Sequence, residues 1–213
     1  SSLPIVEEAL LFQGDDWKQG RARWTNVSPN GKMVAFDADF SGNYRIYFLG
    51  TTDNQQYRFE IVGEQADWAP DSERVVYRSG RDGRTGIWIS NRDDSGHTLI
   101  TENGSDSFPA WSPDGQRLAF SSDQGGRFAI YVMNADGSGA PERLTNLGGD
   151  AFYPAWSPDG SRIAFVTERF TSSLASLRHG DYGLALLDPS TGDITEVQAF
   201  DTGKHINPQW SPD

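Results

Sequence analysis

The seven residues PAWSPDG occur at positions 109–115 and again, unchanged, at 154–160. Weaker copies are DWAPDS from Asp67, NVSPNG from Asn26, and the last six residues of the chain, PQWSPD. A unit that recurs every 40–50 residues constrains the fold more than any other feature, because it predicts one small structural module used several times.

Three positions of the unit recur in the same register. The tryptophan position steps by 41, 43, 45 and 54 residues and holds Val27, Trp68, Trp111, Trp156 and Trp210. The aromatic residue that closes the next apolar run steps by 41, 43 and 45 and falls at Phe36, Tyr77, Phe120 and Phe165. A third marker steps by 41 and 43 and falls at Tyr47, Trp88 and Tyr131. Because the intervals at three separate positions agree, the sequence contains a genuine structural repeat.

Each unit has the pattern of four short strands. The tryptophan segment is the first, and the second is the apolar run after the Pro-Asp-Gly turn: MVAF, RVVY, RLAF and RIAF. The third set (YRIYFL, GIWIS, FAIYVM) is rich in β-branched and aromatic residues, and the fourth (YRFEIV, HTLIT, ERLT, ITEVQAF) is more polar. Ser-Pro-Asp-Gly supplies the turn residues between the first two strands.

The polarity of the strands predicts how the units pack. Middle strands that are apolar on both faces must be covered on both sides, whereas the half-polar fourth strand suits an outer edge. Four-stranded units packed side by side in this way form a β-propeller. We therefore expect an all-β fold: a single β-propeller domain over residues 1–213, built of four-stranded antiparallel blades. The complete blades are expected at about 22–64, 65–105, 106–149 and 150–203.

The chain resembles the TolB-type family of β-propellers, which is WD-repeat-like in architecture. The resemblance rests on PAWSPDGQRLAFSSDQGGRFAIYVMNADGSGAPERLT at 109–145 and on the second copy at 154–165, and it extends over residues 22–213. Val27 in place of Trp, Ser72 in place of the turn glycine, and the missing Tyr-Val-Met-Asn run of the fourth unit depart from the pattern. The resemblance implies a bacterial periplasmic or extracellular setting and contacts with lipoproteins and other envelope proteins.

The two ends of the chain have the pattern of one shared blade. Residues 204–213 would supply its inner strand and residues 5–13 its outer strand, and its two middle strands have no counterpart in the sequence. We therefore expect a partial closing blade and a parent chain that continues past Asp213.

Composition restricts the classes of partner. The formal net charge of −12 disfavours nucleic acid, which needs a basic face, and the sequence has no apolar run long enough to span a membrane. There are no cysteines, and the three histidines, His97, His179 and His205, lie far apart in sequence and are expected in solvated loops rather than at zinc. No cofactor is expected. Acidic loops such as 134–139 and 37–43 leave calcium as an alternative to simple turns.

The predicted function is that of a non-catalytic protein-binding scaffold. The chain has no Gly-x-Ser-x-Gly elbow, although an accessory propeller of a prolyl oligopeptidase-type hydrolase and a propeller enzyme acting on acidic sugars remain alternatives. Binding is expected where aromatic residues precede the inner strands and in the long insertion of the fourth unit, 167–183, because aromatic and arginine side chains are enriched at protein interfaces. The candidate residues are Phe108, Phe152, Tyr153, Arg169, Phe170, Arg178, His179 and His205. The alternative for the aromatic residues is that they plug the mouth of the channel or cover the end of the core.

Overall fold

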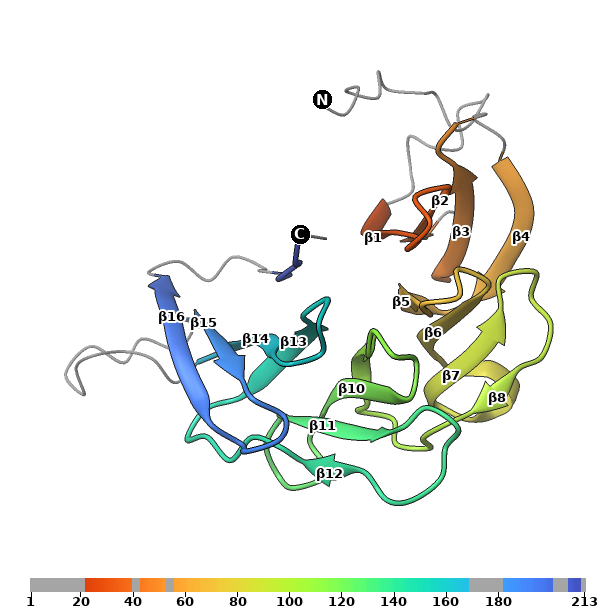
Figure 1. The fold of residues 1–213 in the computed structure, drawn as a ribbon. Coiled ribbons are helices and arrows are strands. Elements are labelled where there is room, and N and C mark those ends of the chain that lie inside the picture. The colour runs from red at the N-terminus through yellow and green to blue at the C-terminus, as the bar shows by residue number, and fades with distance from the viewer. Residues whose placement is uncertain (1–21, 40–42, 53–55, 169–181, 201–206, 212–213) are drawn as a thin grey trace.

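A computed structural model describes residues 22–39, 43–52, 56–168, 182–200 and 207–211 of the chain. These residues form four antiparallel four-stranded sheets and one short 3-10 turn, η2 (Arg81–Gly83), and the described part contains no α-helix. Figure 1 shows the sheets arranged as blades around a common centre, with the inner strands near the axis and the outer strands at the periphery. The chain is an all-β propeller, as the sequence predicts.

Within each sheet the strands follow chain order from the centre outward. The first sheet contains β1 (Ala22–Val27), β2 (Met33–Ala38), β3 (Arg45–Gly50) and β4 (Gln56–Val62). The second contains β5 (Glu64–Trp68), β6 (Arg74–Ser79), β7 (Gly86–Asn91) and β8 (Thr98–Leu99). The third contains β9 (Ser107–Trp111), β10 (Arg117–Ser122), β11 (Ala129–Asn134) and β12 (Glu142–Arg143). The fourth contains β13 (Ala151–Trp156), β14 (Ile163–Thr167), β15 (Tyr182–Leu187) and β16 (Ile194–Phe200).

The repeated tryptophan packs between neighbouring sheets. Trp68 of β5 lies with its ring centroid 5.3 Å from that of Phe48 in the first sheet. Trp111 is buried against Val76 and Ile89 of the second sheet, and Trp156 belongs to one buried cluster with residues of the third sheet. At each of these three boundaries, the inner-strand tryptophan of one sheet covers an apolar face of the preceding sheet. The position of this residue in the repeat predicts the contact.

Polar contacts add to the packing of these rings. The Arg74 guanidinium lies 5.1 Å from the centroid of the Trp111 ring, and Arg117 lies 4.7 Å from that of Trp156. Both arginines begin the second strand of the preceding sheet, so each cation stacks across a sheet boundary. The Trp68 indole N–H also donates to the carbonyl of Asn26 across the first boundary, at 3.1 Å.

The Ser-Pro-Asp-Gly turn is held by its own side chains. Ser112 Oγ donates to Asp114 Oδ1 at 2.6 Å and accepts from the Arg117 N–H at 2.9 Å, while the Gln116 N–H donates to Asp114 Oδ1 at 3.0 Å. Gly115 has a φ of 72°, in the left-handed region where glycine is unstrained. The turns that begin at Ser28 and Ser157 make the same bonds.

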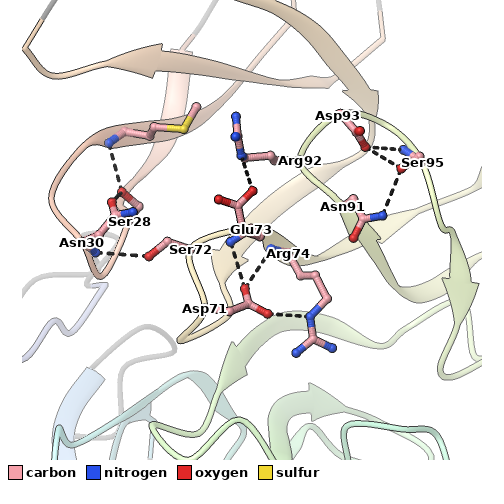
Figure 2. A network of polar contacts seen from close by, with 11 residues as sticks. Ser28, Asn30, Asp71, Ser72, Glu73, Arg74, Asn91, Arg92, Asp93 and Ser95 are labelled. Carbon is pink, nitrogen blue, oxygen red and sulfur yellow. Dashed lines mark hydrogen bonds and ion pairs between the residues drawn. The ribbon is translucent and has the colours of Figure 1, made fainter.

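The second sheet departs from this pattern and compensates for the departure. Ala69 has no hydroxyl, and the Arg74 N–H donates to Asp71 Oδ1 at 3.0 Å instead. Ser72 replaces the turn glycine at a φ of 61°. Its hydroxyl accepts from the Asn30 N–H of the first sheet at 3.1 Å, so the residue that strains this turn also links two blades (Figure 2).

Two expectations fall on residues outside the described ranges. The predicted outer strand at 5–13 and half of the closing segment at 204–213 belong to this part of the chain; the described half, 207–211, contains no strand, and the closing blade stays a prediction. Residues 169–181 of the fourth-unit insertion also lie outside. The insertion does connect β14, which ends at Thr167, with β15, which begins at Tyr182.

The packing makes the tryptophan at the third sheet a strong contributor to stability. Replacing Trp111, which is 5% exposed, by alanine is expected to lower the free energy of unfolding by about 3–5 kcal/mol, because a large cavity opens between two sheets. Urea unfolding followed by circular dichroism measures the change. Val27 occupies the same repeat position in the first sheet but is 62% exposed, so Val27→Ala should change stability by less than about 0.5 kcal/mol. Equal losses in the two variants would contradict the role of the tryptophan.

Candidate functional site: the central channel

The inner strands of all four sheets surround a cavity of about 400 Å³ on the axis of the propeller. Segment 207–211, which includes Trp210, completes its wall. The Trp210 indole N–H donates to the Ala155 carbonyl at 2.9 Å, repeating the contact that Trp68 makes with Asn26. A cavity of this size at the meeting point of several sheets is where propellers and other multi-sheet folds hold ligands.

Every inner strand contains one residue with left-handed backbone next to a break in its pairing register. The four residues are equivalent in the repeat and have φ values of 50–60°: Trp24, Gln65, Phe108 and Tyr153. None is glycine, and a bulky residue in this region costs about 1–2 kcal/mol. The same bulge formed four times in one chain indicates that it serves to direct these four side chains, all of which line the cavity.

Three of the four bulge residues are aromatic, and their rings meet. The Phe108 and Tyr153 centroids lie 4.3 Å apart, and Trp24 lies 5.2 Å from Phe108 and 5.4 Å from Tyr153. Trp24 and Tyr153 come from the first and fourth sheets, so this contact crosses the channel. Such ring pairs each contribute about 0.5–1.5 kcal/mol beyond burial, which offsets the backbone strain. We call Trp24, Phe108 and Tyr153 the aromatic triad.

The fourth bulge residue is polar and joins two sheets. Gln65 Oε1 accepts from the Phe108 N–H at 2.9 Å. Two residues further along the same strand, Asp67 Oδ2 accepts from the Trp111 N–H at 2.7 Å. Asn26, the counterpart of Asp67 in the first sheet, donates from Nδ2 to the Ala66 carbonyl at 2.7 Å. The inner strands of the first three sheets are therefore tied together by side-chain bonds within the channel wall.

Asp67 is an unusual carboxylate. Burial raises its pKa to about 6, although the hydrogen bonds from the backbone N–H groups of Trp111 and Trp68 lower it. The residue nevertheless keeps part of its surface accessible and lines the cavity. Among the described residues that line the cavity, it is the one that carries a formal charge.

The structure places three of the predicted binding residues together. Phe108 and Tyr153 belong to the aromatic triad, and Phe152 packs beside them, 5.9 Å from Tyr153 and 4.8 Å from Phe128. The sequence predicted that they lie in loops leading into the inner strands, either exposed for binding or plugging the mouth of the channel. The loop placement is wrong, because the strands begin earlier, at Ser107 and Ala151. The rings are partly buried, and their role in binding stays a prediction. The other predicted binding residues lie outside the described ranges: Arg169, Phe170, Arg178, His179 and His205.

Asn26, Gln65 and Asp67 were not among the binding residues predicted from the sequence. They could have been found by comparing equivalent positions of the repeat. The position before the tryptophan holds Asn26, Asp67, Ala110 and Ala155, and the position three before it holds Trp24, Gln65, Phe108 and Tyr153. Polar residues at positions that are apolar or aromatic in other units mark a departure that packing alone does not require.

His97 lies in the loop between β7 and β8, as the sequence predicted, but its side chain is only 17% exposed rather than solvated. Its Nδ1 lies 3.0 Å from the hydroxyl of Tyr77, which is fully buried, and its Nε2 lies 2.8 Å from the Asp94 carbonyl oxygen. Arg81 pairs with the Asp94 carboxylate at 3.0 Å. The histidine therefore anchors the outer hairpin of the second sheet to its core.

Two acidic hairpin loops, those after β11 and β7, are held by hydrogen bonds between their own residues. In the loop after β11, the Ser138 N–H donates to Asp136 Oδ1 at 2.8 Å, and Asn134 Nδ2 donates to Ser138 Oγ at 2.9 Å. The loop after β7 repeats these bonds around Asp93 and Ser95 (Figure 2). Their geometry is that of side-chain-stabilised turns. Within the described ranges, no three His, Cys, Asp or Glu side chains gather as metal ligands would.

A fold of radially arranged four-stranded sheets around a lined channel defines a β-propeller. The model of the TolB beta propeller domain matches residues 97–213, and the chain belongs to this family. No curated protein sequence matches the chain significantly. In the described part, no helix is long and apolar enough to cross a membrane.

Solved structures agree with this assignment. A protein described as TolB from Agrobacterium tumefaciens is 25% identical, with a TM-score of 0.68 over 82% of this chain and 65% of its own. TolB from Acinetobacter baumannii is 21% identical, with a TM-score of 0.72 over 88% of this chain and 45% of its own. The chain thus spans less than two thirds of either protein. A puromycin-hydrolyzing peptidase from Mycobacterium tuberculosis shares the fold at 16% identity and a TM-score of 0.59, over 83% of this chain and 31% of its own.

The raised pKa of Asp67 predicts how stability varies with pH. An unfolded aspartate titrates near 3.8, so between about 3.8 and 6 the folded protein holds a proton that the unfolded chain has lost. The free energy of unfolding therefore falls as pH rises through this window. Asp67→Asn, which introduces the residue found at the equivalent position 26, removes this dependence and retains an acceptor for the Trp111 N–H. The variant should gain stability relative to the parent, by about 1 kcal/mol more at pH 7.5 than at pH 5.

Urea unfolding of both proteins at the two pH values measures the difference. Asp82→Asn on the exposed turn η2 serves as the control, because it makes the same charge change away from the channel. An Asp67→Asn gain that is the same at both pH values would contradict the assignment.

Proposed function

We propose that this chain is a non-catalytic binding propeller of the bacterial envelope, and that it captures a protein partner at the mouth of its central channel. The observation that carries the proposal is the aromatic triad. Three rings from three separate sheets, each on a strained backbone, meet beside a cavity of about 400 Å³.

Protein recognition accounts for this arrangement better than packing alone does. Partly buried aromatic rings that surround a cavity are typical anchors for a partner side chain, since they offer a large contact area at little loss of side-chain freedom. Pure packing would not need left-handed backbone at four equivalent positions. The envelope setting is proposed from the likeness to TolB from Agrobacterium tumefaciens and from membership of the family.

The proposal includes the insertion between β14 and β15, on the grounds of its composition. It contains Arg169, Phe170, Arg178 and His179, and with His205 these residues form the second half of the predicted binding set. We propose that this segment contributes contacts around the channel mouth beside Phe152. Deleting residues 171–178 should weaken partner binding and leave the unfolding midpoint unchanged.

The test is capture of a partner by the parent chain and by channel variants. Phe108→Gln and Tyr153→Gln install the residue type that the second sheet already carries at the equivalent left-handed position, Gln65. A partner isolated from a bacterial envelope extract on the immobilised parent chain is purified, and its affinity for each variant is measured by calorimetry. The double variant should bind at least about tenfold more weakly.

Val197→Ala on β16, a half-exposed residue that does not line the channel, is the matched control and should bind as the parent does. Unchanged affinity in the double variant would reject the channel mouth as the binding site. Hydrolysis of the captured protein during the incubation would favour a role beside a hydrolase instead.

A further inference from the structure

The wall of the channel has two chemically different sides. At the two repeat positions that face the cavity, β9 and β13 carry Phe108, Ala110, Tyr153 and Ala155, which are all apolar or aromatic. At the same positions β5 carries Gln65 and Asp67, and β1 is mixed, with Trp24 and Asn26. The third and fourth sheets form the same fold with apolar or aromatic residues at these positions, so the fold does not require polar ones. It is a property of these particular blades.

The polar side contains one negative charge, that of Asp67, and no described residue of the cavity wall carries a positive charge beside it. Burial raises the pKa of Asp67, and the hydrogen bonds from the backbone N–H groups of Trp111 and Trp68 lower it. The described residues that line the cavity include no Lys, Arg or His. A carboxylate kept in a desolvated place without a countercharge is costly, and its cost falls when a ligand brings a positive charge to it.

The aromatic side offers a second kind of interaction for the same ligand group. Trp24, Phe108 and Tyr153 line the cavity that Asp67 also lines. Aromatic faces attract ammonium and guanidinium groups, and most strongly where water is excluded. A hydrated divalent cation gains little from rings and would find a single carboxylate here. The combination therefore fits an organic cation.

We propose that Asp67 and the aromatic triad form a subsite that receives the guanidinium or ammonium group of a basic side chain from the protein partner. This inference rests on the proposed function and names the chemistry of the group that is recognised. The Asp67 carboxylate accepts hydrogen bonds from the cation through the lone pairs that the Trp111 and Trp68 N–H groups leave unused. The net charge of −12 on the chain favours a basic partner over long range.

The experiment uses a small probe in place of the partner. Acetyl-Gly-Arg-Gly-amide is titrated into the isotopically labelled chain, and the indole N–H resonances of the channel tryptophans are followed by NMR. The same peptide with citrulline in place of arginine has nearly the same shape and no charge. We expect saturable shifts with the arginine peptide and at least about tenfold weaker binding of the citrulline peptide.

Variants of the chain test whether the Asp67 carboxylate is the group that binds the cation. Asp67→Asn and Asp67→Ala, the residues at the equivalent positions in the other sheets, should each weaken binding of the arginine peptide by at least about tenfold, and Asp82→Asn should leave it unchanged. Equal binding of the two peptides, or equal binding by the parent and both Asp67 variants, overturns the proposal. An equal loss in Asp82→Asn indicates non-specific attraction to the acidic surface and also overturns it. Shifts of the same resonances by CaCl₂ alone, abolished by Asp67→Asn, would assign the site to a metal ion instead.

Failure of this inference is distinguishable from failure of the proposed function. If Phe108→Gln with Tyr153→Gln weakens partner binding while Asp67→Asn does not, the channel binds the partner without a cation. The opposite result is that the arginine peptide binds through Asp67 while the partner binds the triad variants as tightly as the parent chain. In that case the cation subsite exists, and the channel mouth is not the partner's site.

Discussion

Contact between each sheet and the inner-strand tryptophan of the next is the interaction on which the rest of the structure depends. A four-stranded sheet whose middle strands are apolar on both faces is unstable alone, and a neighbour must cover each face. Trp68, Trp111 and Trp156 do this at three successive boundaries, and arginines stack on two of the rings. Because the tryptophan lies on the innermost strand, the same contact that joins the sheets also brings their inner strands around one axis.

The channel follows from that arrangement, and its chemistry follows from the bulges. A regular inner strand would direct alternate side chains toward the two neighbouring sheets. The left-handed residue in each strand breaks this alternation and turns one further side chain toward the cavity. The strain is compensated locally, by ring contacts within the aromatic triad and by the bond from the Phe108 N–H to Gln65. Strain that recurs at four equivalent places and converges on one cavity is typical of a site that serves a function.

Residues that are the same in every repeat and residues that differ between repeats have different roles in this molecule. The residues that repeat, such as the tryptophan and the Ser-Pro-Asp-Gly turn, build the fold. The residues that differ between equivalent positions give the channel its two sides. Ser72 shows that a departure can also be structural, since it replaces a turn glycine and bonds to the adjacent blade. Asp67 also bonds to the adjacent blade, through the Trp111 N–H, but no Lys, Arg or His stands among the described residues that line the cavity with it.

The sequence by itself determined the propeller, the four strands of each unit and the position of the tryptophans, because these depend on local turn chemistry and on burial patterns that recur in register. It also identified Phe108, Phe152 and Tyr153 as candidate binding residues. Only the tertiary structure decided where these rings point, because a β-bulge shifts the register of one strand without a distinct signature in composition. It also decided that Asp67 is desolvated and that no cation stands among the described residues of the cavity wall, since that depends on which side chains the neighbouring sheets bring to the channel. The partnership of His97 with Tyr77 likewise joins residues twenty positions apart that no local pattern connects.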